Sequence, residues 1–352
     1  MTDWQVPISA ASDEQIETAL AQAHIPALMS ALMHLTGNRD HFCKVRPHFV
    51  MFAEEEDGLS EIDRNRAREL AFDALKKYRD SGCMEPARPS AEDIIAAMNY
   101  ITGTDITPEE VPFLREELNL FGEDGRRVQI ETGTIAAGFR VLIIGTGMSG
   151  ILAAIRLQQE GIPFLMLEKN PEMTGTWYEN TYPGCQVDSA NHLYSYMLEP
   201  NHQWSGHYSG SAELKAYFTR IVDKYGLRQY VRLNTQVECA SFDEKQNQWK
   251  VECTSHGVRE VLVADTIISA VGQLNSPKMP EIEGLDSFEG IAFHSARWEH
   301  EHSLEGKRVI VIGTGCSAAQ FVPRIAPHCG ELKVFQRSAP WLLPTETYHQ
   351  PM

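Results

Sequence analysis

The sequence lacks the features that would place it in a secreted, membrane or metal-binding class. Its seven cysteines show no CxxC or other paired spacing, so reduced thiols are expected instead of a disulfide framework or a zinc site. No apolar run approaches the roughly 20 residues of a membrane span, and the first residues show no secretory signal. We therefore expect a cytoplasmic protein without a bound metal ion and without a membrane partner.

Positive charge is also scarce. The formal net charge is −17, and residues 1–137 hold 13 Lys and Arg against 25 Asp and Glu. An acidic surface of this kind argues against nucleic acid as a partner and is typical of a solubilising surface. With 43% hydrophobic and 22% charged residues the chain is otherwise ordinary for a globular protein, and its length allows two or three domains.

Residues 1–137 carry the start and stop signals of helices. Ser12–Gln15 and Ser90–Asp93 are capping boxes, in which two side chains satisfy two free backbone N–H groups. Thr107–Glu110 predicts an N-cap followed by a proline at the first helical position, and glycines such as Gly37 predict helix ends. We expect a helical N-terminal domain without a catalytic constellation, which could assemble the chain into a homo-oligomer through apolar surface.

The sequence pattern changes from helical signals to a strand signal at Val141–Ile144. This continuous apolar run predicts a strand buried on both faces. It leads into Gly145, Gly147 and Gly150, and a helix is expected over residues 151–160. Glycines at this spacing permit a tight turn and the close approach of a pyrophosphate to the free N–H groups of a helix N-terminus. Glu168 ends the next predicted strand, at about the distance expected for an acid that binds a ribose hydroxyl pair.

A second unit repeats this arrangement near the end of the chain. The predicted strand at residues 308–312 leads into Gly313, Gly315 and Ser317, with a helix expected from Ala319. The next strand ends in Arg337, where the first unit has an acid. A guanidinium can hold a 2′-phosphate through charged hydrogen bonds, whereas a carboxylate would repel it. The second site should therefore prefer NADPH.

Two dinucleotide sites in one chain imply two nucleotides, and the usual partner of NADPH in such an arrangement is a flavin. Residues 265–272, a predicted strand that ends in a small-residue turn at Gly272, resemble the second flavin-contacting motif of FAD enzymes. Strands that alternate with helices indicate an α/β fold. We predict two Rossmann-like domains after the helical one: an FAD domain over residues 138–277 and an NADPH domain over residues 278–352.

Between the two units, the run Phe288–Trp298 matches the pattern F-x-G-x-x-x-H-x-x-x-W. This run resembles the fingerprint of Baeyer–Villiger monooxygenases, although Glu299 follows where the family usually has Pro or Asp. The segments Gly175–Tyr178 and Tyr182–Asp188 resemble the flavin-edge part of that family. The resemblance covers about residues 138–345, and the acidic N-terminal extension is similar to that of 4-hydroxyacetophenone monooxygenases.

The resemblance implies that FAD and NADPH convert a ketone and O2 to an ester by way of a flavin C4a-peroxide. Thr176 and Trp177 would contact the flavin, and Asp188 would be the family's acid beside the flavin, which interacts with a catalytic arginine. His294 and Trp298 would couple NADP binding to domain movement, although a linker histidine and a packed tryptophan are the structural alternative.

The family's catalytic arginine lies well beyond the second glycine motif, so no residue of this sequence is assigned that role. We therefore expect a chain that is truncated at its C-terminal end, with an incomplete FAD domain and a truncated NADPH domain. Two other functions stay open: a related flavin monooxygenase that oxidises nitrogen or sulfur, and a non-catalytic protein that binds nucleotides.

Overall fold

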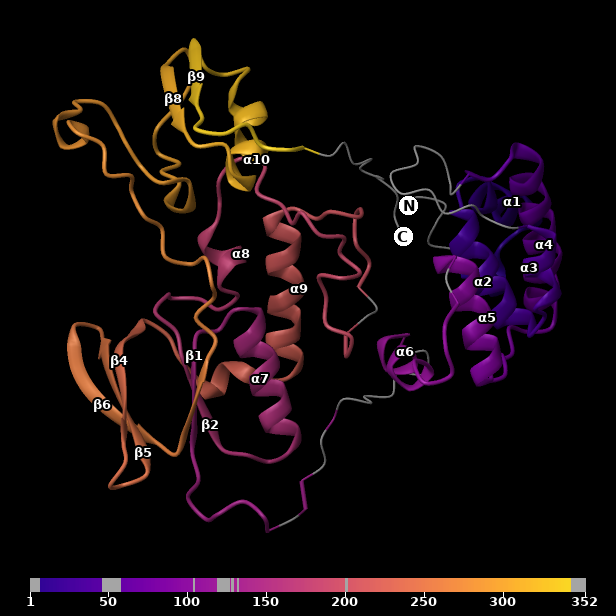
Figure 1. The fold of residues 1–352 in the computed structure, drawn as a ribbon, viewed down its shortest axis with the longest axis horizontal. Helices are drawn as coiled ribbons and strands as arrows, with labels where there is room; N and C mark the ends of the chain where they lie inside the picture. Colours follow the sequence, from indigo (N-terminus) through magenta and orange to yellow (C-terminus); the bar gives the residue numbers. More distant parts are fainter. Residues whose placement is uncertain are drawn as a thin grey trace. The chain divides into compact units, whose positions relative to one another are not determined.

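The computed structural model describes residues 7–45, 58–103, 105–118, 127, 130–131, 133–199 and 202–342. The chain divides into two compact units, residues 1–126 and residues 127–352, which are coloured along the sequence in Figure 1. Each unit is described by itself. In the described part of the chain, no helix has the length and apolar character needed to cross a membrane.

The N-terminal unit is helical, as predicted. Both capping boxes form: the Ser12 hydroxyl accepts from the N–H of Gln15, and Ser90 pairs with Asp93 in the same reciprocal way. Apolar residues at helical spacing, among them Ile16 and Leu20, build one core between the helices. The α-helices of this unit are α1 (Asp13–Ala21), α2 (Ile25–Thr36), α3 (Asp40–Lys44), α4 (Glu61–Asp80), α5 (Ala91–Thr102) and α6 (Val111–Leu118).

The predicted start of α6 was wrong by three residues. Residues 108–110 form a turn, and the helix begins at Val111 instead of at Pro108. The carboxylate of Glu110 accepts hydrogen bonds from both the N–H and the hydroxyl of Thr107. These bonds close a separate turn ahead of the helix, so the capping signal was real but belonged to that turn.

The second unit is built around a four-stranded sheet in which every neighbouring pair is parallel, in the order β3-β2-β1-β7. The predicted strand before the first glycine motif is β1 (Val141–Ile144), and it lies in the middle between β2 (Phe164–Leu167) and β7 (Thr266–Ser269). The edge strand β3 (Val231–Arg232) is short. Since all the carboxyl ends of a parallel sheet meet at one edge, the turns after β1, β2 and β7 become neighbours.

Side chains alternate across this sheet and so build two cores. Ile143 and Met166 face α7 (Met148–Gln159) and α9 (Ser211–Lys224), whereas Leu142 and Leu167 face the opposite side. That side is covered by a second, antiparallel sheet, and Figure 1 shows the parallel strands between the two helices and this sheet. The continuous apolar run of β1 thus fills both cores at once.

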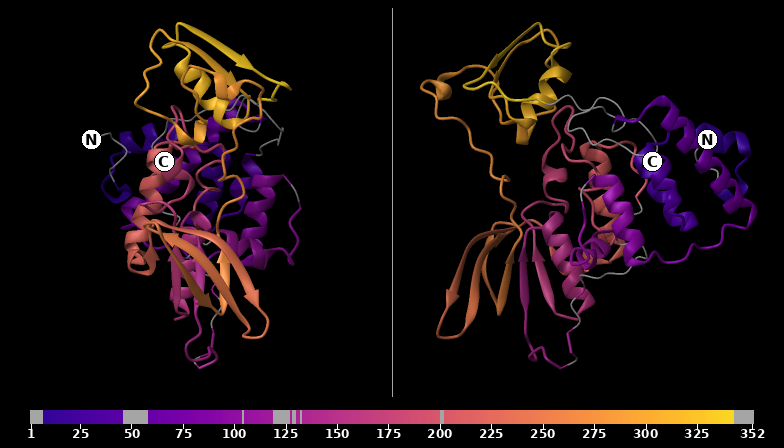
Figure 2. Two further views of the ribbon diagram at one scale, coloured as in Figure 1. Left: turned by 90° about the vertical axis from the view of Figure 1, so that its left-hand side faces the viewer. Right: turned by 45° about the vertical axis from the view of Figure 1, so that its right-hand side comes forward.

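The antiparallel sheet has the order β4-β5-β6, with strands β4 (Thr235–Asp243), β5 (Gln248–Ser255) and β6 (Val258–Ala264). Val251 of β5 and Ala264 of β6 pack against the parallel sheet. Figure 2 shows the hairpins extending away from the parallel strands toward their tips. The short helices α8 (Thr176–Glu179) and η4 (Leu227–Tyr230) complete this part of the chain.

The second glycine motif forms a smaller strand–helix–strand unit. Strands β8 (Arg308–Ile312) and β9 (Glu331–Phe335) pair in parallel, and α10 (Cys316–Ile325) lies between them in sequence. Val311 faces the helix and is buried, whereas Ile310, Ile312 and Phe335 on the other face are each more than half exposed. A parallel sheet normally buries both faces, so one face of this pair is uncovered in the described part of the chain.

The predicted helix starts after the glycine motifs need correction. Helix α7 begins at Met148 and α10 at Cys316, each three residues before the predicted first residue. Gly147 and Gly315 are the N-caps, so the last residues of each motif already belong to the first helical turn. The second unit is mixed α/β with a parallel sheet, as predicted, while the division into domains at residues 137 and 277 stays a prediction. The final residues, 343–352, lie outside the described part of the chain.

Candidate functional site

The turn after β1 can be made only by glycine at two of its three motif positions. Gly145 has φ = +97°, and a Cβ there would lie 2.5 Å from the carbonyl oxygen of Ala270 at the end of β7. At Gly150 a Cβ would lie 2.0 Å from the carbonyl oxygen of Gly145. Since backbone atoms cannot move aside, these two glycines are needed for the turn and for the packing of α7 on it.

Gly147 is different, because the protein itself leaves room for a side chain there. Its φ is −73°, and the nearest atom to an added Cβ is the Cα of Gly175 at 3.7 Å, an ordinary contact. Gly147 is the N-cap of α7, whose first N–H groups have no partner within the helix. Contacts within the protein therefore do not require glycine at this position. The glycine of the motif instead fits a ligand that approaches the backbone from outside the fold.

A second turn closes over the N-terminus of α7. Thr174 and Gly175 both have positive φ, at 85° and 54°, and the N–H of Thr174 donates to the carbonyl of Thr146 over 3.0 Å. The hydroxyl of Thr174 is buried, and no other described residue gives it a hydrogen-bond partner. Strained backbone and an orphaned polar atom are typical of a binding site. Thr176 begins α8 and is exposed, whereas Trp177 is buried.

Glu168 lies at the end of β2, as predicted, and its side chain is already saturated with hydrogen bonds. One carboxylate oxygen accepts from the N–H and the hydroxyl of Thr146, over 2.9 and 2.7 Å. The other accepts from the N–H and the side-chain amide of Asn170, over 3.0 and 2.9 Å. A carboxylate offers about four acceptor positions, so a ribose would have to displace a bond that the protein makes.

The Asn170 amide also reaches a second buried acid, Glu179, over 2.7 Å. Lys169 and Arg297 lie within 3.0 and 3.1 Å of the Glu179 carboxylate, whose side chain is only 4% exposed. Burial alone would raise the pKa of Glu179, but the hydrogen bonds from Asn170 and Lys169 outweigh it. The charges of Lys169 and Arg297 add to this effect, so the pKa lies below its usual value.

Asp188 lies on an exposed loop, two residues after the isolated bridge between Gln186 and Gly210. No other described residue forms an ion pair with it. The charge of Asp188 acts on Tyr194, whose ring meets Trp177 edge-on at 5.7 Å between centroids. Burial raises the pKa of Tyr194, and the negative charge of Asp188 adds to that effect. Asp188 is therefore linked to a predicted flavin contact, Trp177, only through Tyr194.

Gly272 follows β7 and has φ = +76°, with no close contact around an added Cβ. It lies at the same edge of the sheet as the turn after β1, because β7 is the neighbour of β1. The structure thus brings Gly145, Glu168 and Gly272 together at one edge, as the motifs predict for a dinucleotide site.

The second glycine motif is much more open than the first. Gly313 has φ = +106°, but no atom lies within 4 Å of a Cβ added there or at Gly315. Ser317 lies in the first turn of α10, and Arg337 is exposed two residues beyond the end of β9. The two glycines are therefore unobstructed, whereas the half-buried Ser317 hydroxyl interacts with Tyr182.

The fingerprint segment packs onto α10. The Trp298 ring lies 5.3 Å from the rings of both Phe293 and Phe321, centroid to centroid, and a Cβ on Gly290 would lie 2.4 Å from the Phe288 ring. His294 accepts a hydrogen bond from the N–H of Ala296 and so caps the short 3₁₀ helix η6 (Ser295–Arg297). The ring contacts explain the role of Phe293 and Trp298, whereas the Phe288 ring is exposed and can move away from position 290.

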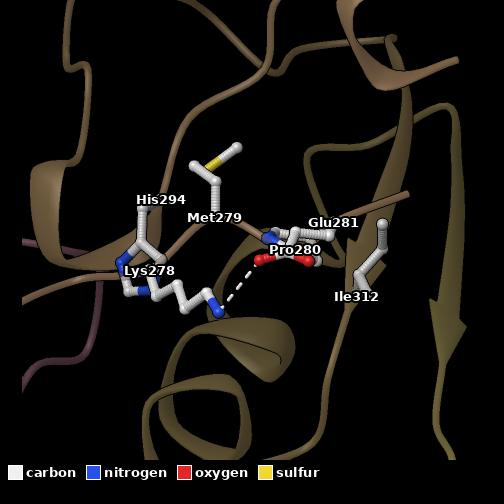
Figure 3. A pocket seen from close by; sticks show the side chains of 6 residues that line it. All are labelled: Lys278, Met279, Pro280, Glu281, His294 and Ile312. Carbon is white, nitrogen blue, oxygen red and sulfur yellow. Dashed lines mark ion pairs between the residues drawn. The ribbon is translucent and has the colours of Figure 1, made fainter. Parts of the chain in front are cut away.

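His294 also lines an open pocket of roughly 490 Å³ (Figure 3), together with residues of the segment that leads to the second motif. Ile312, the last residue of β8, lies on the opposite wall. The fingerprint histidine is therefore placed next to the strand end from which Gly313 follows. The lining residues are Lys278, Met279, Pro280, Glu281, His294 and Ile312.

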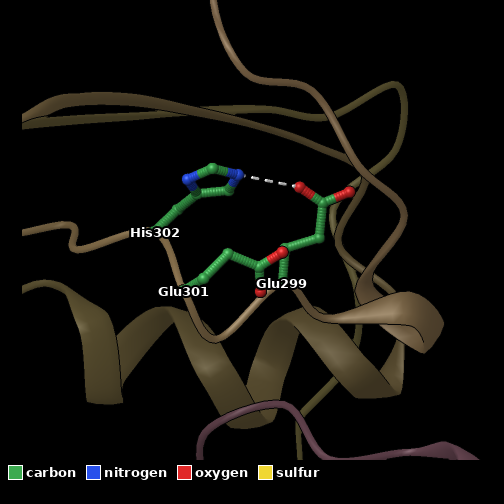
Figure 4. A group of neighbouring side chains, drawn as sticks. All are labelled: Glu299, Glu301 and His302. Carbon is green, nitrogen blue, oxygen red and sulfur yellow. Dashed lines mark ion pairs between the residues drawn. The ribbon is translucent and has the colours of Figure 1, made fainter.

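Three further polar side chains meet just after the fingerprint (Figure 4). The ligand atoms of Glu299, Glu301 and His302 lie within 4.8 Å of one another, and a His302 nitrogen lies 3.1 Å from the Glu299 carboxylate. An attraction between His302 and Glu299 is sufficient to explain the arrangement, since exposed acids commonly cluster without an ion. The sequence analysis did not single out these residues.

Several residues that shape the site had no sequence signal. Thr146, Asn170 and Glu179 contact the predicted acid Glu168 directly or through one another. Thr146 is a variable position of the first glycine motif, and Asn170 and Glu179 belong neither to a glycine motif nor to the quoted fingerprint positions. Only the fold shows that Glu179 and Arg297, 118 residues apart, form one ion pair.

Comparison with known proteins gives a consistent result. Residues 142–350 match the family model described as pyridine nucleotide-disulphide oxidoreductase. A Baeyer–Villiger monooxygenase of Streptomyces coelicolor is 45% identical over 206 residues, which are 58% of this chain and 39% of that protein. The uncharacterised monooxygenase y4iD of Sinorhizobium fredii is 34% identical over 343 residues, 96% of this chain and 51% of that protein.

Among solved structures, OTEMO in complex with FAD and NADP matches with a TM-score of 0.57 and 35% identity, over 62% of this chain and 42% of OTEMO. The chain thus spans about half or less of the length of the relatives it matches. The match to y4iD includes the helical N-terminal unit, which the other two matches do not reach in full.

The charge on Glu179 should make stability depend on pH. Because its folded pKa is lowered, its contribution is present above the usual pKa of a glutamate and is lost as the pH falls through the folded value. We expect Glu179→Gln to lower the free energy of unfolding at pH 7 by about 1–3 kcal/mol. In urea titrations followed by tryptophan fluorescence, the difference from wild type should shrink below about pH 4.

Glu281→Gln is the matched control, because Glu281 also pairs with a lysine but is 86% exposed. It should leave stability unchanged at both pH values. An equal loss for Glu179→Gln at pH 7 and pH 3.5 would contradict the lowered pKa.

Proposed function

The chain belongs to the pyridine nucleotide-disulphide oxidoreductase family, and on that premise we propose that it is a flavin-dependent Baeyer–Villiger monooxygenase that uses FAD, NADPH and O2. The family's name does not imply a disulfide reaction here, because the sequence has no CxxC or CxxxxC pair. The named relatives that carry the proposal are monooxygenases, and OTEMO was solved with both FAD and NADP.

The observation that carries the proposal is the site around Gly147. The fold leaves a backbone approach open there, beside the free N–H groups of α7 and the orphaned hydroxyl of Thr174. A pyrophosphate fits these donors, because a helix N-terminus favours negative charge. The buried carboxylate of Glu168, at the end of the neighbouring strand, fits the ribose hydroxyls of the same nucleotide. We therefore assign FAD to the first motif.

NADPH is assigned to the second motif on chemical grounds. Gly313 and Gly315 leave the N-terminus of α10 unobstructed, and Arg337 offers an exposed guanidinium near the end of the second strand. An arginine there can form charged, bidentate hydrogen bonds with a 2′-phosphate. Ser317, in the first turn of α10, adds a hydroxyl beside the proposed pyrophosphate position.

Bound flavin would supply the redox chemistry with O2, and the chain's own residues would bind and orient it. Trp177 and the turn at Thr174 cover one end of the proposed site, and Glu168 holds the other. Asp188 lies close enough to influence Tyr194 and is exposed, so it is available to pair with a cation near the flavin. His294 and Trp298 would transmit coenzyme binding to the fingerprint segment.

The substrate is proposed to be a ketone, and an aryl ketone is our first choice. This choice depends on the likeness of the N-terminal extension to 4-hydroxyacetophenone monooxygenases. The helical unit would serve assembly into a homo-oligomer, since several of its helices are capped and amphipathic and its described residues form no catalytic constellation. A second candidate is oxidation of nitrogen or sulfur by a related flavin monooxygenase, and Trp298 at the final aromatic position of the fingerprint distinguishes the ketone reaction from it.

Gly147 allows FAD binding to be separated from folding. Gly147→Ala adds a Cβ that the protein tolerates but a pyrophosphate does not, so the variant should fold and lose bound flavin. Gly150→Ala places a Cβ against backbone and should instead destabilise the chain. Flavin absorbance after gel filtration, compared with the thermal unfolding of each variant, measures both. A Gly147→Ala protein that keeps its full flavin content would show that the site is misassigned.

Arg337 should set the choice of coenzyme. Arg337→Ala removes one charged contact with the 2′-phosphate, a loss on the order of 1.5–3 kcal/mol, or roughly 10- to 150-fold in affinity. The KM for NADPH should rise accordingly, whereas the KM for NADH should change little. Arg308→Ala, at the start of β8 and far from the strand end, is the control. Equal losses for both coenzymes would overturn the assignment.

The reaction itself is tested by product analysis with FAD, NADPH and ¹⁸O2. We expect NADPH to reduce the bound flavin. We also expect an aryl ketone to be converted to an ester that contains one ¹⁸O atom, and the formation of this ester to depend on NADPH. An aryl sulfide and a tertiary amine are offered in parallel. A sulfoxide or N-oxide without ester would favour the second candidate. Flavin that binds but is not reduced by NADPH would leave a nucleotide-binding protein.

A further inference from the structure

The side chain of Gln320, on α10, forms hydrogen bonds with a segment more than 130 residues earlier in the chain. Its Oε1 accepts from the hydroxyl of Tyr182 over 2.9 Å and from the N–H of Gln186 over 3.3 Å. Its Nε2 donates to the carbonyl of Gln186 over 3.0 Å. One amide thus satisfies the backbone donor and acceptor of one residue together with a neighbouring hydroxyl.

The backbone N–H and C=O of Gln186 are available for these bonds because the antiparallel bridge between Gln186 and Gly210 does not use them. In the bridge to Gly210, the bonds run from the N–H of Val187 to Ser209 and from the N–H of Ser211 to Cys185. The N–H and C=O of Gln186 therefore point to the other side, as in a non-hydrogen-bonded antiparallel pair. Gln320 takes the place that a further strand would occupy.

The contact around this amide is tightly packed. A Cβ on Gly184 would lie 2.8 Å from the Cγ of Arg324 and 2.9 Å from the carbonyl oxygen of Gln320. The ring of Tyr182 lies 6.0 Å from Phe321, the ring that also contacts Trp298 of the fingerprint. Tyr182 is 8% exposed, and burial raises its pKa to about 12, although the Ser317 hydroxyl opposes the shift. The amide therefore lies in a partly buried interface, with the buried Tyr182 on one side.

The two segments that Gln320 joins belong to the two proposed sites, the NADPH site and the flavin site. Helix α10 begins at the second glycine motif and holds Gly315 as its N-cap. The segment from Tyr182 leads to Asp188, two residues beyond Gln186. The Gln320 amide is thus a direct side-chain connection between α10 and the Tyr182–Asp188 segment, in addition to the contacts of the fingerprint. It lies in the N-terminal half of α10, the half that leads from the proposed coenzyme site.

We propose that Gln320 is a positioning residue, whose amide holds the NADPH-binding helix α10 against the Tyr182–Asp188 segment and thereby sets the coenzyme relative to the flavin. The role in coenzyme placement rests on the proposed function. The clamp itself does not, since it consists only of contacts within the chain. Loss of the amide should leave both nucleotide sites present but loosen their relative position.

The clamp is tested first without any nucleotide, by amide hydrogen exchange in the full chain. Gln320→Met keeps the length of the side chain and removes the bonds, so the N–H of Gln186 should exchange at least about 10-fold faster in the peptide covering residues 182–188. Gln246→Met, on the exposed turn between β4 and β5, is the control and should change nothing there. Unchanged exchange in Gln320→Met would overturn the clamp.

The positioning role is tested in the chain loaded with FAD, by anaerobic reduction of the flavin at saturating NADPH. We expect Gln320→Met to bind FAD as wild type does and to be reduced about 10-fold more slowly. Gln320→Glu keeps the acceptor but loses the donor, so its rate should lie between the two. Faster exchange with unchanged reduction would show a structural clamp only and overturn the positioning role.

Gly184→Ala provides a second variant that leaves Gln320 intact. It should displace α10 and slow the reduction in the same direction, since the added Cβ meets the helix backbone. A Gly184→Ala protein reduced at the wild-type rate would count against positioning by this interface. If wild type binds no FAD, the proposed function fails, while the exchange measurement still decides whether the clamp exists.

Discussion

The left-handed turn at Gly145, closed against the carbonyl of Ala270, is the constraint on which the rest of the second unit depends. It lets the chain leave β1 and enter α7 without a side chain between them, so α7 lies against the end of the sheet. The strand order places β2 and β7 on either side of β1. Their carboxyl ends then bring Glu168 and Gly272 to the same edge. A binding site at this edge follows from the turn.

Around that turn, buried polar groups are linked into one network. Glu168 accepts from Thr146 and Asn170, and Asn170 also donates to Glu179, which is paired with Arg297 of the fingerprint. A nucleotide ribose that binds Glu168 must replace one of these bonds, and the carboxylate is already held in place. Such a site is preorganised, because its charged group does not have to be oriented when the ligand arrives.

The second glycine motif depends on the parallel-sheet core for much of its order. Helix α10 buries Phe321 and Ile325 in the core that also holds Ile143 and Met166, and Gln320 and Gly184 fix the contact. Helix α10 covers only one face of the two-stranded sheet of β8 and β9 in the described part of the chain. The open glycines at 313 and 315 contrast with the closed turn at Gly145, although the two motifs are nearly identical in sequence. Similar local signals therefore yield a preorganised site in one place and an exposed turn in the other.

The sequence by itself determined the local features: the capping boxes, the strand before each glycine motif, the positive φ of Gly145 and Gly313, and the position of Glu168 at a strand end. These features depend on residues within about five positions of one another or on the period of a strand. Local signals did misplace the starts of α6, α7 and α10 by three residues. The capping signal before α6 closes a separate turn, whereas α7 and α10 begin within their glycine motifs, directly after Gly147 and Gly315. Only the tertiary structure decided which glycines the fold requires, which acids are paired, and where α10 docks. These outcomes depend on contacts such as Gly145 with Ala270, Glu179 with Arg297 and Gln320 with Gln186, whose partners are more than 100 residues apart, and no local pattern encodes which distant residues will meet.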